Sequence, residues 1–360
     1  METNEKSTKI LALTGKDDSR EIYLIRYRQK EQIMQTRVAR IHQFGGPEVL
    51  EIETDILPDP GPGEVVLRQE AAAITFADTL MCQGKYYLKP PLPTVLGLQA
   101  AGTIVAVGSG VENFIPGDRA AYLFEIGGYA DARIIAAEKL SHPPPELDAK
   151  AFVATFSRGM TAQYLMRRLY RVEAGETILV HSAAGGMGSL LAQWASKIGA
   201  TVIGTVGAPE KFALAEESGC SHVIDYTNEN FADRVLDITD GEGVPVVFDA
   251  VGADAYSGNI RCLAPRGWFV NYGNSSGFLP PIDAMELNKK SLIFTKASMK
   301  DYTRTPEERA EMTAEVVAAI IDGTIKSKIT REYDLSEIAT AHADMIARRT
   351  TGATILTFEP

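Results

Sequence analysis

The amino-acid sequence predicts an α/β protein that joins a β-rich unit to a doubly wound, six-stranded parallel sheet. The first observation is a stretch of short alternating runs, broken by proline and glycine, from residue 37 to about residue 137. The second is a regular alternation of strand-like and helix-like runs from about residue 155 to residue 297. The third is a pair of helical patterns after Asp301, followed by one last strand-like run.

The region from Arg37 to about Ala137 is predicted to form a partly closed, all-β unit. Alternating apolar and polar residues predict strands in "EVVLRQEAAAI", "AAGTIVAVGSGV" and "DRAAYLF". Clusters rich in proline and glycine, such as "PDPGPGE", separate these runs and are typical of turns.

The middle region alternates strand and helix, which requires a parallel sheet with helices on both faces. "TILVH" precedes the helix-like "GSLLAQWASKIG", "TVIGTV" precedes "PEKFALAEESG", and "HVIDY" precedes "ENFADRVLDIT". Three more strands are expected in "VPVVFDAVG", "GWFVNYG" and "SLIFTKA". Beyond Asp301, "PEERAEMTAEVVAAIIDG" and "LSEIATAHADMIARRT" predict helices, and "GATILTF" predicts a final strand.

Composition and charge argue against several classes of protein. The chain of 360 residues carries a net charge of −11, which disfavours nucleic acids and anionic membrane surfaces as partners. The three cysteines are scattered and form no C-x-x-C or Cys/His cluster, so we expect a reducing, cytoplasmic location and no structural zinc. No apolar run reaches the length that a membrane helix needs. Residues 1–35 are polar and lack periodicity, and we expect a loosely ordered extension there.

The stretch Ala183–Gly188, "AAGGMG", has the form A-x-G-x-x-G and lies between an expected strand and an expected helix. That setting is the one in which a glycine-rich turn binds a dinucleotide. Small residues let the backbone approach a pyrophosphate, the helix N-terminus offers it free N–H groups, and Gly188 lets helix and strand pack closely. Because the turn begins a series of six strands, we predict dinucleotide binding rather than a tight turn without a ligand.

The second strand of this series favours NADPH over NADH. NAD sites usually place Asp or Glu at its end, whereas this sequence has Thr205, Val206 and Gly207 there. An acid would repel a 2′-phosphate, and Lys211 offers a positive charge close by. Arg348 near the C-terminus is a second candidate for this phosphate. From charge alone, each cation has the alternative of being a solvated surface residue.

These segments resemble the zinc-independent quinone oxidoreductases of the medium-chain dehydrogenase/reductase superfamily, the ζ-crystallin-like enzymes. The resemblance runs from about Arg37 to Phe358 and includes "GGPEVLEIE", "PGPGEVVLR", "GLQAAGTIVAVGSGVENFIPGDR", "GGYADARII", "RGMTAQYLMRR" and "NYGNSSG". It implies a GroES-like catalytic domain, an inserted Rossmann domain that binds NADPH, and a C-terminal return to the first domain. We therefore expect the extension over 1–35, the first part of the catalytic domain over 36–155, the Rossmann domain over 156–297 and the return over 298–360.

The resemblance also implies which residues contact NADPH. "TFADT" matches the loop near the nicotinamide, "NYGNS" matches a segment on the same side, and Tyr226 matches a tyrosine beside the ribose phosphate. The implied cofactor contacts are Phe76, Asp78, Thr79, Tyr164, Gly185, Gly186, Met187, Gly188, Gly207, Lys211, Tyr226, Tyr272, Gly273, Asn274, Ser275 and Arg348. The resemblance further suggests a homodimer, paired near "SLIFTKASM".

Three positions depart from the family pattern. Thr75 stands where relatives often have asparagine, so it keeps a hydroxyl group and loses the amide. Leu80 replaces a tyrosine of close relatives and makes that wall more apolar. Ser196 replaces a lysine or arginine at a position that we expect on the surface.

The sequence offers no set of ligands for a catalytic zinc ion. Zinc relatives place a cysteine in the loop that here holds Thr75 to Asp78, and Gly-His-Glu where Gly97, Leu98 and Gln99 stand. Without a Lewis acid, oxidation of an alcohol at neutral pH has little support. An electron-poor acceptor takes up hydride more readily, so we expect NADPH to reduce a quinone or a conjugated enone.

Thr75, Tyr86 and Lys296 are the candidates for direct roles in catalysis. Thr75 would contact the nicotinamide or the substrate. Tyr86 falls where the family has a cleft tyrosine, and it either donates a proton or hydrogen bond to the acceptor or forms an aromatic wall. Lys296 falls where close relatives have a cleft arginine, and it either attracts developing charge or lies at the rim.

Two alternatives stay open at this point. The first is an NADPH-dependent enone or 2-alkenal reductase with little quinone activity. The second is a non-catalytic, crystallin-like NADPH-binding protein, for which the pI of about 5.1 argues against an RNA partner.

Overall fold

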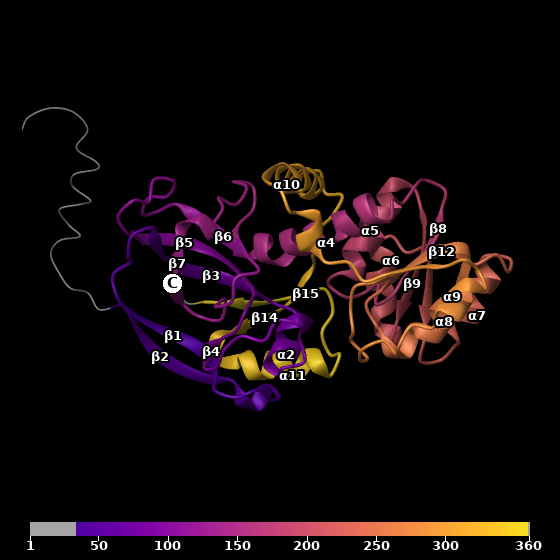
Figure 1. The fold of residues 1–360 in the computed structure, drawn as a ribbon, viewed down its shortest axis with the longest axis horizontal. Helices are drawn as coiled ribbons and strands as arrows, with labels where there is room; N and C mark the ends of the chain where they lie inside the picture. The colour runs from indigo at the N-terminus through magenta and orange to yellow at the C-terminus, as the bar shows by residue number, and fades with distance from the viewer. Residues whose placement is uncertain (1–33, 359–360) are drawn as a thin grey trace, which may run out of the picture.

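The computed structural model of the chain describes residues 34–358, which form two units joined by a helical segment (Figure 1). The expected N-terminal extension lies outside the described residues, except that Met34 and Gln35 begin the first strand. The C-terminal elements, drawn in yellow, lie beside the indigo and purple strands of the first unit. The chain therefore returns to the unit where it started.

The second unit contains a six-stranded sheet in which all strands are parallel. Its strands lie in the order β10-β9-β8-β11-β12-β13, so the order reverses between β8 and β11. The strands are β8 (Thr177–Val180), β9 (Thr201–Val206), β10 (His222–Asp225), β11 (Val244–Asp249), β12 (Leu263–Asn271) and β13 (Ile293–Thr295). This doubly wound arrangement confirms the predicted fold and creates a crevice at the carboxyl ends of the strands, where the order reverses.

Helices follow most of these strands, as the alternation in the sequence predicts. Polar caps define some of the ends: the Asn230 side chain accepts hydrogen bonds from the first turn of α7, and Gly199 ends α5 with a φ of 101°. The helices are α5 (Gly188–Ile198), η5 (Pro209–Lys211), α6 (Phe212–Glu217), α7 (Phe231–Ile238), η6 (Ala253–Ala255), α8 (Tyr256–Cys262) and α9 (Ala284–Asn288). Within residues 34–358, no helix is both long and apolar enough to cross a membrane.

The first unit is built around β3, which pairs antiparallel with three strands. One of the three is the C-terminal strand β15, and this pairing accounts for the strand-like "GATILTF" at the end of the chain. The strands are β1 (Met34–Ile41), β2 (Glu51–Leu57), β3 (Glu64–Ile74), β4 (Thr94–Val95), β5 (Gln99–Val107), β6 (Arg119–Leu123), β7 (Ala132–Ala136), β14 (Ile329–Asp334) and β15 (Ala353–Thr357). Its helices are η1 (Pro47–Val49), α2 (Phe76–Cys82), η2 (Ala137–Lys139), η8 (Leu335–Glu337) and α11 (Ile338–Ile346).

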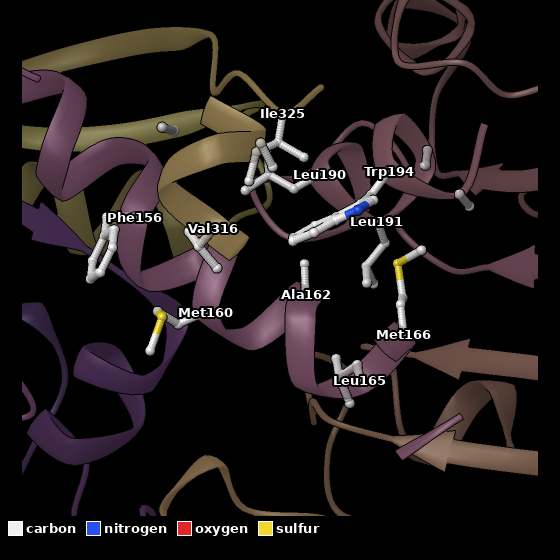
Figure 2. Packing of buried hydrophobic residues seen from close by; sticks show 14 of the residues in the cluster. Phe156, Met160, Ala162, Leu165, Met166, Leu190, Leu191, Trp194, Val316 and Ile325 are labelled. Carbon is white, nitrogen blue, oxygen red and sulfur yellow. The ribbon is translucent and has the colours of Figure 1, made fainter. Parts of the chain in front are cut away.

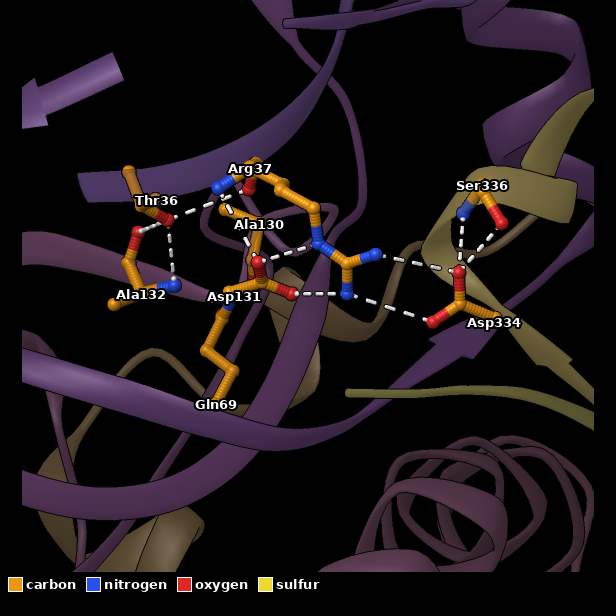
Figure 3. Close-up of polar contacts among 8 residues, drawn as sticks. All are labelled: Thr36, Arg37, Gln69, Ala130, Asp131, Ala132, Asp334 and Ser336. Atoms are coloured by element: carbon orange, nitrogen blue, oxygen red, sulfur yellow. Dashed lines mark hydrogen bonds and ion pairs between the residues drawn. The ribbon is translucent and has the colours of Figure 1, made fainter. Parts of the chain in front are cut away.

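An arginine links the start of the chain to its returning segment (Figure 3). The Arg37 guanidinium in β1 donates to Asp131 at 2.8 Å and reaches Asp334 at the end of β14 at 3.5 Å. The hydrogen bond to Asp131 raises the pKa of Arg37, which therefore stays charged. Such partly exposed pairs contribute at most about 1 kcal/mol each to stability. Their main effect is therefore to position the end of β14 relative to β1.

A helical segment connects the two units and shares its core with both. It consists of α3 (Ala149–Ala151), η3 (Phe152–Phe156), α4 (Ser157–Gln163) and η4 (Tyr164–Leu169), and it is covered by η7 (Met299–Tyr302) and α10 (Pro306–Ile321). Figure 2 shows Met160 of α4, Val316 of α10 and Leu190 and Trp194 of α5 in one apolar cluster. A Cβ atom on Gly159 would lie 2.8 Å from a methyl group of Val316, so the Val316 side chain packs directly on the backbone of α4. The units are therefore packed together through a continuous core.

Leu190 offers a test of this shared core because it is fully buried in α5. Leu190→Ala removes apolar contacts and leaves a cavity, so we expect the free energy of unfolding to fall by about 2–5 kcal/mol. Urea and thermal unfolding of the purified protein measure this loss. Lys197→Ala on an exposed position of the same helix is the control, with an expected change within about 0.5 kcal/mol. Equal effects of the two substitutions would contradict the shared core.

Candidate active site

A cleft of about 430 Å³ lies at the carboxyl ends of β8, β9, β11 and β12 and is closed on its other side by the first unit. The second unit contributes residues 184–188, Val206, Gly207, Lys211 and residues 272–275 to its walls. The first unit, the connecting helix and the returning segment contribute Ile74–Ala77, Ser157, Arg158, Thr161 and part of 345–354. The cleft thus lies where the strand order reverses, the usual place for a ligand in such sheets.

The glycine turn between β8 and α5 is enclosed on three sides. A Cβ atom on Gly188 would lie 2.2 Å from the Ser182 carbonyl oxygen, and one on Gly186 would lie 2.8 Å from that of Gly352. Gly352 also donates its N–H to the Ala184 carbonyl at 3.1 Å. No side chain caps the start of α5 at Met187, so the first N–H groups of this helix lack side-chain partners. The turn therefore has the form expected for a pyrophosphate cradle.

The end of the cleft beside β9 is positively charged. Gly207, Lys211, Tyr226 and Arg348 meet there, and the Lys211 ammonium donates to the Arg348 carbonyl oxygen at 3.0 Å. Arg348 also donates to the carbonyl oxygen of Ser275 at 3.3 Å. The residues that line the whole cleft include three cations and no carboxylate, in a chain with a net charge of −11. These residues fit an anionic dinucleotide that carries a 2′-phosphate.

The loop at the opposite end of the cleft is fixed by a capping box. Thr75 precedes α2, and both its N–H and its hydroxyl donate to the Asp78 carboxylate, at 2.8 and 2.7 Å. Asp78 is fully buried, and one of its oxygens has no hydrogen-bond partner. Burial raises the pKa of Asp78 to about 6, although the Thr75 hydrogen bonds and the charge of Arg158 oppose this rise. The cap holds Thr75 and Phe76 at the cleft wall.

Arg158 connects this loop to the glycine turn. Its guanidinium donates to the Ala154 carbonyl at 2.7 Å and to the Ile74 carbonyl at 3.4 Å, directly before Thr75. Its Nε lies 2.9 Å from the place that a Cβ atom on Gly186 would take. Burial lowers the pKa of Arg158 to about 10, so it remains charged at neutral pH. One buried cation thus contacts the walls from both units.

The wall beside this loop is apolar and aromatic. Leu80, Tyr86, Leu98, Phe124 and Met345 line it, together with the amide of Gln99. Burial raises the pKa of the Tyr86 hydroxyl, and the neighbouring Tyr87 adds to the rise. Neither Leu98 nor Gln99 offers an imidazole or thiolate to a metal ion. Within residues 34–358, the one group of three side chains spaced to hold a cation is His42, Glu51 and Glu53, outside the cleft.

The structure brings most of the predicted site residues together in this cleft. Those that line it are Thr75, Phe76, Tyr86, Gly185, Gly186, Met187, Gly188, Gly207, Lys211, Tyr226, Tyr272, Gly273, Asn274, Ser275 and Arg348. Four others do not line it, namely Asp78, Thr79, Tyr164 and Lys296. Asp78 and Thr79 are buried in α2, and Tyr164 stacks on Tyr302. Lys296 donates to the side-chain oxygens of Asn271 and Asn274, the latter at 3.1 Å, and burial lowers its pKa.

Sequence reasoning missed several residues of the cleft. The main ones are Arg158 and Phe124, with Ser157, Thr161, Ser182, Ala250, Met345, Thr350, Thr351, Gly352 and Thr354. Arg158 could have been predicted, because a single charged residue within the apolar run "AFVATFSRGMTAQYLM" indicates a buried charge with a specific role. Nothing in the sequence indicated Phe124, since an aromatic residue at the end of a strand usually belongs to the hydrophobic core.

Two family models match the chain. The alcohol dehydrogenase GroES-like domain matches residues 61–174, and the zinc-binding dehydrogenase domain matches residues 186–320. The first match covers most of the β-rich unit and the connecting helix. The second covers most of the parallel sheet and part of the returning segment.

Known proteins are similar over nearly their whole length. The quinone oxidoreductase of Pseudomonas aeruginosa is 43% identical over 87% of this chain and 97% of its own. The 2-haloacrylate reductase of a Burkholderia species is 38% identical over 88% of this chain and 98% of its own. The crystal structure of Escherichia coli quinone oxidoreductase complexed with NADPH superposes with a TM-score of 0.84, at 37% identity, over 89% of this chain and 99% of that one.

The buried carboxyl group of Asp78 leads to a pH-dependent prediction. Its pKa of about 6 in the fold exceeds the value of about 4 for an unfolded chain, so its ionisation destabilises the fold as the pH rises between these values. Asp78→Asn has no such ionisation. We expect the stability of the variant, relative to the parent, to increase by up to about 3 kcal/mol from pH 4 to pH 6 and then stay constant. Unfolding curves across this range measure the difference, and a difference that does not change with pH would contradict the prediction.

Proposed function

Since this chain belongs to the quinone oxidoreductases of the medium-chain dehydrogenase/reductase superfamily, we propose that it reduces quinones with NADPH and without a metal ion. The observation that carries the proposal is the cleft itself. It presents three cations and no carboxylate to the cofactor, and Thr75, Leu98 and Gln99, which line it, offer neither a thiolate nor an imidazole. The cofactor is NADPH, which an Escherichia coli relative of the same fold binds.

Each part of the cleft has a role in this proposal. Lys211 and Arg348 bind the 2′-phosphate, with Gly207 and Tyr226 beside them. The turn from Gly185 to Gly188 binds the pyrophosphate through backbone N–H groups. The segments Thr75–Phe76 and 272–275, which both line the cleft, would hold the nicotinamide.

When bound, NADPH supplies the hydride, and the chain's own residues orient the acceptor and exclude water. Tyr86 lines the cleft with a protonated hydroxyl, whose pKa burial raises, and it is the residue that would donate a hydrogen bond to the acceptor oxygen. Lys296 does not line the cleft and acts through Asn274, whose side chain it holds. Lys296 is therefore a positioning residue. The one proton that the quinone takes up in addition to the hydride comes from solvent through the open cleft.

Reduction of activated alkenes is the second candidate function. A 2-haloacrylate reductase, 38% identical to this chain, supports it. The apolar wall formed by Leu80 and Leu98 would admit a conjugated enone as well as a quinone. A panel of acceptors separates the two activities.

We further propose a homodimer in the cytoplasm. β13 is the last strand of the parallel sheet, and among the strands of residues 34–358 it pairs only with β12, which leaves its outer edge open there. Ile293 on this strand is 40% exposed, and Phe278 and Met285 nearby in the sequence are also exposed. Three free, buried cysteines fit a reducing compartment.

An acceptor screen with NADPH and NADH side by side tests the function. We expect quinones to oxidise NADPH at least tenfold faster than NADH. Lys211→Ala should remove most of that preference, because it should lower the affinity for NADPH by about tenfold and leave the affinity for NADH unchanged. Lys328→Ala, a lysine outside the cleft, is the control. Turnover of simple alcohols but of no quinone or enone would refute the proposal, and NADPH binding without turnover would establish a binding protein instead.

The dimer has its own test. Ile293→Lys places a charge on the open edge of β13, so we expect the dimer of 39.0 kDa chains to dissociate into monomers. Light scattering coupled to size-exclusion chromatography measures the mass. Ile321→Lys on α10, at a position 55% exposed, should leave the dimer intact. A parent protein that is already monomeric would contradict the proposal.

A further inference from the structure

Three strained residues line the cleft. Outside glycine, a positive φ occurs within residues 34–358 at six positions, and three of these belong to the cleft walls: Phe124, Ser182 and Arg348. Phe124 has a φ of 62°, the left-handed region, which side chains as bulky as phenylalanine rarely adopt. Such strain persists where the surroundings impose it, and it gathers at functional sites.

The backbone around Phe124 is held on both sides. Leu123 before it pairs with Gln99 in the β5–β6 ladder, and Glu125 after it donates its N–H to the Leu98 carbonyl at 3.1 Å. Two residues further on, Gly127 donates to the Gly97 carbonyl at 3.0 Å. The chain therefore turns sharply at Phe124 around the segment 97–99, and the turn directs its ring to the cleft wall.

Burial does not explain why a phenylalanine occupies this turn. Its side chain is 52% exposed, and among the described residues it has no aromatic ring partner. Glycine would adopt the same backbone conformation without strain. The phenylalanine thus lowers the stability of the fold, and few contacts within the protein compensate for this. We therefore expect the ring to contact a ligand in the cleft.

The position of Phe124 indicates the ligand. Phe124 directly follows Leu123, the ladder partner of Gln99, and it lines the cleft together with Leu98, Thr75 and Tyr86. These residues face the acceptor in the proposed function, on which the present inference rests. Leu80 and Leu98 make the same wall apolar.

We propose that Phe124 is the stacking surface for the acceptor ring and makes the site selective for flat, fused-ring quinones over small linear enones. An offset-stacked or edge-to-face ring pair is favourable beyond the apolar area that it buries. A naphthoquinone offers a ring of the right size for such a pair, whereas a four-carbon enone does not. The exposed ring then covers the bound quinone and removes it from water.

Steady-state kinetics with naphthoquinone and with methyl vinyl ketone test this selectivity. We expect Phe124→Ala to lower kcat/KM for naphthoquinone by about threefold to tenfold and to leave that for methyl vinyl ketone within about twofold. NADPH affinity, measured by fluorescence titration, should not change. Ile115→Ala is the control: it removes a large apolar side chain that is 57% exposed and outside the cleft, and it should change kcat/KM for neither acceptor.

Stability provides a readout that does not depend on turnover. Glycine relieves the strain at this position and alanine does not, so Phe124→Gly should have a Tm about 2–4 °C above that of Phe124→Ala. The inference would be overturned if Phe124→Ala lost kcat/KM equally with both acceptors. It would also be overturned if the Tm of Phe124→Gly were no higher than that of Phe124→Ala. If the parent reduces no quinone at all, the proposed function fails. If the parent reduces naphthoquinone but Phe124→Ala keeps its selectivity, only the present inference fails.

Discussion

The close approach of three chain segments at the glycine turn is the constraint on which the rest of the structure depends. Gly185 forms a bridge with Gly352, Gly352 donates to Ala184, and Arg158 lies against Gly186. A side chain at Gly186 would collide with the Gly352 backbone and with Arg158. The turn therefore does more than leave room for a phosphate: it lets the returning segment and the connecting helix close the cleft over the parallel sheet.

Charge reinforces this geometry. The chain is acidic overall, yet the cleft is lined by Arg158, Lys211 and Arg348 without a carboxylate. Asp78, two residues after the lining residue Phe76, is buried in the core, where Thr75 and the charge of Arg158 partly compensate its burial. The field in the cleft thus attracts an anionic cofactor. At the far end the wall turns apolar, which suits an acceptor that needs no metal ion to take up hydride.

Sequence reasoning predicted the parts of the site that depend on local chemistry. Gly188 was expected to allow close packing, and a Cβ atom there would lie 2.2 Å from the Ser182 oxygen. Lys211 and Arg348 were expected near one phosphate, and they lie in contact. The misses depend on packing between distant segments. The strand ladder to Gln99 and the hydrogen bond to Leu98 fix Phe124, and neither contact can be read from the residues around it. Likewise, the spacing in "TFADT" could not tell which side of the short helix α2 faces the cleft, and Asp78 and Thr79 face the core.

The central claim is that this chain transfers hydride from NADPH to a quinone without a metal ion. A single-turnover stopped-flow experiment tests it most directly, using protein treated with a strong chelator and checked for metal content. The protein, preloaded with NADPH and mixed with naphthoquinone, should oxidise its cofactor at the rate of the untreated protein. A rate that falls with the metal content and returns when zinc is added would contradict the account.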